Sequence, residues 1–198
     1  MSIQSLPSGK TSRASQTIFS QPKFNRCVGR FVARDQLARD VACLLEFEDE
    51  ISSWNCRSLQ LRHGFDTYSP DFLAERQSDV LVIDAVGQRR PPQWVAEAII
   101  REGFTYRTMS RGDIDPIRLK NCKDLLQCSG GEVSLGDRVR LLSVLDEQSS
   151  LTLAESLTVF REIMPIRGLA NMAVARLIEI DLDTALIGPE TFVRRYRG

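Results

Sequence analysis

The sequence contains a single histidine, His63, and carries no net charge, because 26 Lys and Arg residues balance 26 Asp and Glu residues. It also has no apolar run that approaches the ~18 residues of a transmembrane helix, so we expect no contact with a membrane. The first residues lack the apolar stretch of a secretory signal. These absences predict a cytoplasmic protein.

Metal-binding motifs built from cysteine and histidine are also missing. The five cysteines are an odd number, and none forms a CxxC pair. Since a structural zinc site needs clustered sulfur and nitrogen ligands, this spacing argues against one. We expect reduced thiols instead, at Cys27, Cys43, Cys56, Cys122 and Cys128.

The charges that are present are unevenly distributed. Residues 1–40 hold seven Lys and Arg against two Asp, whereas residues 41–131 have a net charge of −3 and residues 132–198 of −2. Residues 1–30, which include Arg30, are therefore predicted to form a flexible basic arm. Such an arm could hold DNA phosphates, although an ordinary solvated terminus has the same composition.

Residues 31–130 show the pattern of an α/β domain. Apolar residues at helical spacing predict a helix over residues 35–47, with Asp35 as its cap. Residues 80–86 (VLVIDAV) are apolar on both faces, as in a central strand covered on both sides. Further extended segments are expected over residues 53–62, 68–73 and 104–109, and further helices over residues 93–102 and 115–127.

Gly130 and Gly131 mark a predicted domain boundary. Beyond it, residues 131–198 contain three helical runs and a short extended tail, which is the outline of a small helical, winged-helix-like domain. The helical runs are residues 135–147, 152–162 and 168–180, and the tail is residues 185–193.

In a winged helix, residues 168–179 would form the helix presented to the DNA major groove. Its nucleic-acid-binding candidates are Arg167, Asn171 and Arg176, and Arg194 and Arg195 near the end of the chain could contact phosphate. Arg30 and Arg89 are further nucleic-acid-binding candidates. Because the domain is net acidic, docking to a protein remains as open as binding to DNA.

The stretch YSPDFLAERQSDVLVIDAV contains the clearest chemical pattern. Asp71 follows Pro70 at the start of one predicted strand, and Asp84 lies inside the next. Adjacent strands would bring both carboxylates together as an oxygen site for Mg²⁺, able to assist displacement at phosphate. In the alternative interpretation, Asp71 caps a turn and a neighbouring arginine or backbone donor satisfies Asp84.

The ordered series LLEFED, SSWNCRSLQL, YSPDFL and VLVIDAV resembles the PD-(D/E)xK nuclease superfamily. More narrowly, it is similar to TnsA, the endonuclease subunit of heteromeric bacterial transposases, over about residues 31–127. The resemblance implies a restriction-endonuclease-like core, with Asp71 and Asp84 as catalytic and metal-binding residues and Mg²⁺ as the cofactor of an active site. It also implies DNA and a transposase subunit as partners.

Two positions depart from the family pattern. Val86 stands where the motif has a lysine, and Ala38 stands where the helix has a glutamate. Valine cannot stabilise charge on a phosphate and alanine cannot bind a metal. The preferred interpretation is thus a nuclease-fold protein of a mobile element that has lost cleavage and binds DNA or a transposase partner.

Two other functions stay open. The first is an active Mg²⁺-dependent endonuclease that uses a substitute group from elsewhere in the chain. The candidate substitutes are Gln88, Arg89, Arg57, Asp40 and Glu46. The second is a regulatory or protein-interaction module built around the winged helix.

Overall fold

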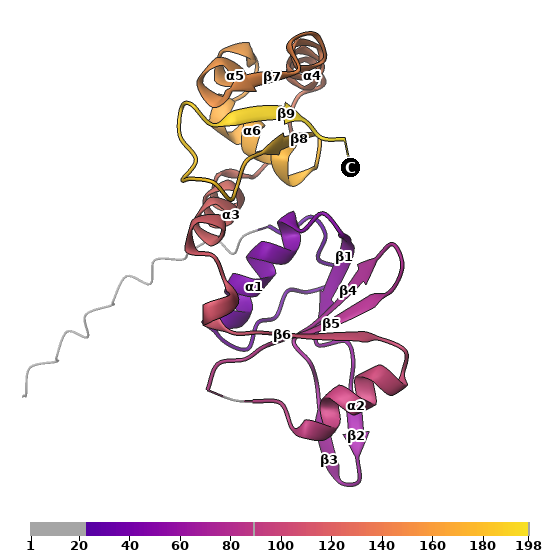
Figure 1. Cartoon of the computed structure of the whole chain (residues 1–198). Coiled ribbons are helices and arrows are strands. Elements are labelled where there is room, and N and C mark those ends of the chain that lie inside the picture. The colour runs from indigo at the N-terminus through magenta and orange to yellow at the C-terminus, as the bar shows by residue number, and fades with distance from the viewer. Residues whose placement is uncertain (1–22, 89, 198) are drawn as a thin grey trace, which may run out of the picture.

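Figure 1 shows a computed structural model, which describes residues 23–88 and 90–197. A mixed sheet with helices against its faces lies in the lower part of the view, and further helices with a small antiparallel sheet lie above it. The chain is therefore a mixed α/β protein, as the sequence pattern predicts.

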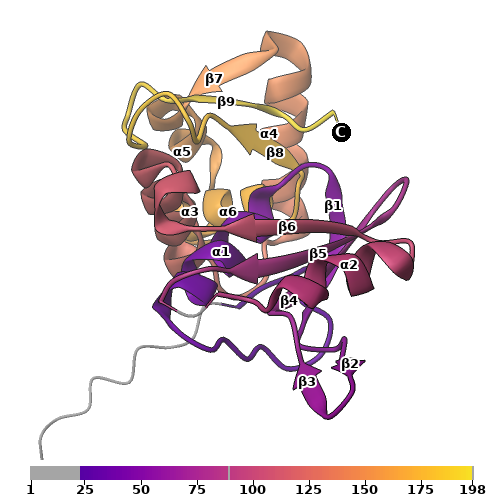
Figure 2. The same cartoon turned by 60° about the horizontal axis from the view of Figure 1, so that its bottom comes forward.

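The larger sheet has four strands, two of them inner ones. Its four strands are β1 (Ile51–Cys56), β4 (Phe72–Arg76), β5 (Val80–Ala85) and β6 (Thr105–Met109), in the order β1-β4-β5-β6. β5 pairs antiparallel with β4 and parallel with β6. A separate hairpin of β2 (Leu61–His63) and β3 (Asp66–Tyr68) lies beyond one end of the sheet (Figure 2).

Both faces of β5 are covered, which confirms the prediction of a buried central strand. Ile83 belongs to the apolar cluster that includes the buried face of α1 (Gln36–Phe47). Val82 points to the other face and belongs to the cluster of α2 (Gln93–Arg101). Burial on both sides explains why this strand contains almost no polar side chains.

The helix α1 begins where the sequence predicts. The Asp35 side chain accepts a hydrogen bond of 2.8 Å from the Ala38 amide, which satisfies one of the unpaired donors at the helix start. Part of the predicted flexible basic arm contacts the folded core, through Phe24 and Cys27. The backbone amides of Asn25 and Arg26 donate to the Glu46 carboxylate. The rest of the predicted arm, residues 1–22, lies outside the described residues.

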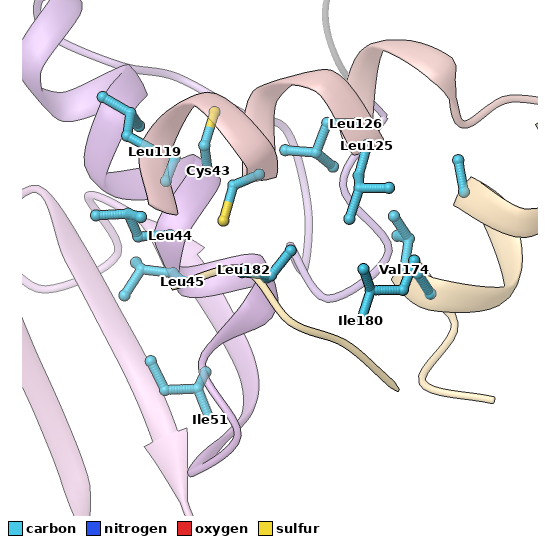
Figure 3. Packing of buried hydrophobic residues seen from close by; sticks show 14 of the residues in the cluster. Cys43, Leu44, Leu45, Ile51, Leu119, Leu125, Leu126, Val174, Ile180 and Leu182 are labelled. Carbon is cyan, nitrogen blue, oxygen red and sulfur yellow. The ribbon is translucent and has the colours of Figure 1, made fainter. Parts of the chain in front are cut away.

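The helix α3 (Pro116–Cys128) follows the short 3-10 helix η1 (Arg111–Asp113) and lies between the two parts of the chain (Figure 1). Figure 3 shows Leu119 of α3 near Cys43 of α1, while Leu125 points toward Val174 and Ile180. One continuous apolar cluster therefore runs from α1 through α3 to the C-terminal elements. The division into domains at residue 130 stays a prediction.

The C-terminal part consists of three helices and three short strands. They are α4 (Leu135–Gln148), β7 (Ser150–Thr152), α5 (Leu153–Val159), α6 (Pro165–Val174), β8 (Ile178–Ile180) and β9 (Phe192–Arg195). The three strands form an antiparallel sheet in the order β7-β9-β8. The start of α5 is capped by Thr152, because Thr152 and Glu155 form a reciprocal capping box.

Several expected elements differ from the structure. The segment expected to be extended over residues 53–62 divides into β1, which ends at Cys56, and β2, which begins at Leu61. The helix expected over residues 152–162 ends at Val159, and the tail expected over residues 185–193 contains a strand only from Phe192. The extended segment over residues 68–73 is interrupted, since β3 ends at Tyr68 and β4 begins only at Phe72, after Pro70. The helix expected over residues 168–180 begins earlier, at the Pro165 end of α6, and ends at Val174. Arg176 then adopts a φ of 54°, which turns the chain into β8.

Among residues 23–88 and 90–197, no helix is long and apolar enough to span a membrane.

Candidate functional site

The structure brings the two predicted carboxylates together. Asp71 immediately precedes β4, and the pairing of Phe72 with Ile83 places it beside Asp84 in β5. The Asp71 amide donates a hydrogen bond of 3.2 Å to Asp84 Oδ1, and the Ala85 amide donates one of 2.9 Å to Asp71 Oδ2. Both acids are buried, with 3% of Asp71 and none of Asp84 exposed. The prediction of adjacent acids is confirmed.

An arginine that the sequence patterns did not single out forms an ion pair with one of the two acids. Arg34 lies just ahead of α1, and its Nη2 is 2.7 Å from Asp71 Oδ2. The same nitrogen donates a second hydrogen bond, of 2.6 Å, to the Ala85 carbonyl oxygen. The guanidinium therefore neutralises Asp71 directly and links the start of α1 to the end of β5.

Tyrosines satisfy the other carboxylate. Tyr106 in β6 donates a hydrogen bond of 2.7 Å to Asp84 Oδ2. Burial, and then the hydrogen bond to Asp84, raise the pKa of the Tyr106 hydroxyl, so it remains a donor at neutral pH. Burial raises the pKa of Tyr68 to about 12, with the charge of Asp84 adding to the effect.

Burial and ion pairing have opposite effects on the pKa values of Asp71 and Arg34. Burial raises the pKa of Asp71, and the Ala85 amide and the Arg34 guanidinium oppose that rise. Burial alone would lower the pKa of Arg34, but the charge of Asp71 and a hydrogen bond with Tyr68 raise it overall. Arg34 thus keeps its positive charge against the acid.

The residues present do not fit a magnesium ion. At least three of the four carboxylate oxygens of Asp71 and Asp84 already accept a hydrogen bond from the protein. No group of three or more His, Cys, Asp or Glu side chains that could hold a metal occurs in the described part of the chain. Ala38 is buried in the core and Val86 is an apolar side chain, so neither completes the site.

The acidic candidates for a substitute group have other partners. Asp40 forms ion pairs with Arg111 and Lys123. Burial favours its neutral form, but the bonds to Lys123, Gln36 and Arg111 lower the pKa of Asp40 overall. The Glu46 carboxylate accepts a hydrogen bond of 3.1 Å from Trp54 Nε1, besides the amides described above.

The remaining candidates do not reach the carboxylates through any described contact. Arg57 and Gln88 are exposed, and only the backbone of Arg57 approaches the site, through its amide and the Asp71 carbonyl oxygen at 2.9 Å. Arg89 lies outside the described residues. The basic group beside the acids is therefore Arg34, which comes from the segment before α1.

The predicted nucleic-acid contacts are scattered over the fold. Arg30, Arg167 and Arg194 are exposed. Arg195 forms an ion pair with Asp146 across the C-terminal elements. Of the predicted set, Arg194 and Arg195 are neighbours in β9, and Arg167 and Asn171 lie one turn apart on α6. Arg30 and Arg176 lie outside the helices and strands, and Arg89 lies outside the described residues.

Two residues expected on the outer face of the C-terminal helix are instead half-buried. Asn171 accepts a hydrogen bond of 3.0 Å from the Gly130 amide and so holds the link between α3 and α4. Arg176 donates to the Glu48 carbonyl oxygen, and its guanidinium lies 5.6 Å from the centre of the Tyr196 ring. Both side chains are engaged within the protein.

No protein-family model matches the sequence, and no curated protein matches it.

Proposed function

We propose that this chain is a TnsA-like, nuclease-fold protein of a mobile element that does not cut DNA and acts by binding DNA or a transposase partner. The observation that carries the proposal is the position of Arg34, whose guanidinium bonds to Asp71 where an active site would need a free carboxylate. Val86 and Ala38 support the same conclusion, since neither side chain can assist phosphate chemistry.

The fold supports the resemblance on which the proposal is based. The two acids lie at the junction of β4 and β5, and β6 runs parallel to β5 after the α2 crossover, beside the helix α1. A restriction-endonuclease-like core requires a mixed sheet of this kind. The C-terminal order of helix, strand, two helices and two strands, with β9 between β7 and β8, supports the winged-helix-like interpretation.

The way α6 is covered favours contacts made outside that helix. Six of its ten residues are buried, and α3 packs against it (Figure 1). A helix that reads the major groove must expose several neighbouring side chains to base edges. DNA contact is therefore assigned to the basic residues near the two ends of the chain, at Lys10 and Arg13 and at Arg194 and Arg195, and a transposase partner to the remaining surface.

A nicking assay tests the loss of cleavage. Wild-type protein is incubated with supercoiled plasmid and Mg²⁺ or Mn²⁺, beside Asp71→Ala and Asp84→Ala. We expect the wild type to relax no more plasmid than either variant. Metal-dependent nicking that both substitutions abolish would contradict the proposal and favour the active endonuclease, with Arg34 as its basic residue.

A gel-retardation series tests the binding function. We expect retardation of duplex DNA that weakens steeply as salt rises, because phosphate contacts release counterions. The pairs Lys10→Ala with Arg13→Ala, and Arg194→Ala with Arg195→Ala, should each weaken it, whereas Arg101→Ala at the exposed end of α2 serves as the control. Absence of any retardation would direct the search to a protein partner.

A further inference from the structure

Two oxygen atoms, one from Asp71 just before β4 and one from Ala85 at the end of β5, lie close to the same nitrogen of Arg34. Its Nη2 lies 2.7 Å from Asp71 Oδ2 and 2.6 Å from the Ala85 carbonyl oxygen. The Asp84 carboxylate adjoins them, since its Oδ1 accepts the Asp71 amide. Carboxylate and carbonyl oxygens are the ligands that Mg²⁺ and Mn²⁺ prefer, so the guanidinium stands where a hard cation would find its ligands.

Hydrogen bonds hold the chain before Arg34 and directly after it. Ahead of it, Glu46 accepts the amides of Asn25 and Arg26. Directly after it, Asp35 caps α1. The guanidinium itself bridges the segment before α1 and the end of β5, through Asp71 and the Ala85 carbonyl oxygen.

We propose that Arg34 is an internal replacement for a divalent cation: it supplies the positive charge beside the buried carboxylates and excludes Mg²⁺ and Mn²⁺ from them. This inference rests on the proposed function, a nuclease fold that does not cut DNA, but the experiment that tests it uses no DNA. Removal of the guanidinium should release Asp71 Oδ2 and the Ala85 carbonyl oxygen from their shared donor, beside the Asp84 carboxylate, and so make room for a hard divalent cation.

The test compares full-length wild type with Arg34→Ser in MnCl₂, by thermal unfolding and by the electron paramagnetic resonance signal of free Mn²⁺. The wild type should show no change in Tm and no loss of free Mn²⁺. Arg34→Ser should bind about one Mn²⁺, and its Tm should rise by roughly 5–10 °C at ~100 times the Kd. The double variant Arg34→Ser with Asp84→Asn should lose most of this response.

Arg39→Ser, which removes an exposed arginine of α1, is the matched control and should behave as the wild type. Binding of Mn²⁺ by the wild type at Asp71 and Asp84 would overturn the inference, as would a folded Arg34→Ser variant that binds no Mn²⁺.

If Arg34→Ser does not fold in the absence of metal, recovery of its fold by Mn²⁺ supports the inference. Arg34→Gln is the second variant for this case. The inference is overturned if neither variant folds or binds Mn²⁺ when the metal is added.

The two proposals can fail separately. Plasmid nicking by the wild type would remove the proposed function whatever the variants bind. If the wild type binds DNA without cutting it and the Arg34 variants do not bind Mn²⁺, the proposed function is supported and the role assigned to Arg34 is contradicted.

Discussion

At the scale of single residues, the two buried acids are stabilised by different means. Asp71 pairs with the charged Arg34, whereas Asp84 depends on a backbone amide and the Tyr106 hydroxyl. For Asp84, the alternative interpretation of a backbone donor agrees with the structure, since the Asp71 amide donates to it, whereas the neighbouring arginine pairs with Asp71. Each donor occupies an oxygen that phosphate chemistry would need.

Asp71→Ala should destabilise the fold by about 2–3 kcal/mol, because it takes the nearest carboxylate from the partly buried Arg34 guanidinium, which keeps, in the described part of the chain, only the Ala85 carbonyl oxygen, Tyr68 and the more distant Asp35 carboxylate at 3.7 Å. Solvent reaches part of the arginine side chain, so the loss falls below that of a fully buried pair. Urea unfolding measures it. Asp124→Ala, which breaks an exposed pair with Lys120, should change stability by less than ~0.5 kcal/mol. Equal losses in the two variants would contradict this account.

The neighbours of the acids could be predicted only in part. Asp71 and Asp84 lie on consecutive strands, so their spacing alone indicates that they meet. Arg34 and Tyr106 reach them from a segment before α1 and from β6, and they converge only once the sheet has formed. No local pattern marks either residue, and Arg34 resembles the other basic residues of the first 40.

At the scale of elements, local signals placed α1, β5 and α3 well because each has a cap or an uninterrupted apolar pattern. Asp115 caps α3 as Asp35 caps α1, through a hydrogen bond to the Arg118 amide. The end of α6 was harder to predict, since the apolar run continues into β8. The turn at Arg176 that separates the two elements depends on its tertiary contact with Glu48.

Asp137 joins two C-terminal elements and makes them sensitive to acid. Its buried carboxylate accepts hydrogen bonds of 2.8–3.1 Å from the amides of residues 161–163. Burial favours the neutral acid, but these bonds and the charge of Arg140 lower the pKa of Asp137 overall. A lowered pKa gives stability that is present above the unfolded value and is lost as the pH falls through the folded value.

We therefore expect the free energy of unfolding to fall between about pH 5 and pH 2, and Asp137→Asn to reduce that dependence. Urea unfolding over this range measures both proteins. The control is Asp146→Asn, at an exposed ion pair with Arg195, which should leave the slope nearly unchanged. An identical slope in the wild type and in Asp137→Asn would contradict the assignment.

At the scale of the whole molecule, α3 connects the sheet to the C-terminal elements. Asn121 of α3 is buried and donates to the carbonyl oxygens of Leu182 and Ala185, at 2.9 and 2.8 Å. Its Oδ1 accepts the Ile187 amide at 3.0 Å. Because the apolar cluster continues across the same helix, we infer that the two parts stabilise each other.

This coupling predicts a single unfolding transition. Fluorescence of Trp54 and Trp94, which lie in the first part, should follow the same urea curve as the far-ultraviolet circular dichroism of the whole chain. Asn121→Ala leaves three backbone groups unpaired and should move both curves together by about 2–3 kcal/mol. Two separate transitions, with only one displaced by Asn121→Ala, would show independent parts instead.

The central claim is that the acidic pair, closed by Arg34, no longer supports strand cleavage. The most direct measurement is the rate at which wild-type protein nicks supercoiled plasmid in Mn²⁺, compared with Asp84→Ala at equal concentration. Our account predicts the same background rate for both proteins, with and without the metal. A metal-dependent rate in the wild type that disappears in Asp84→Ala would contradict it.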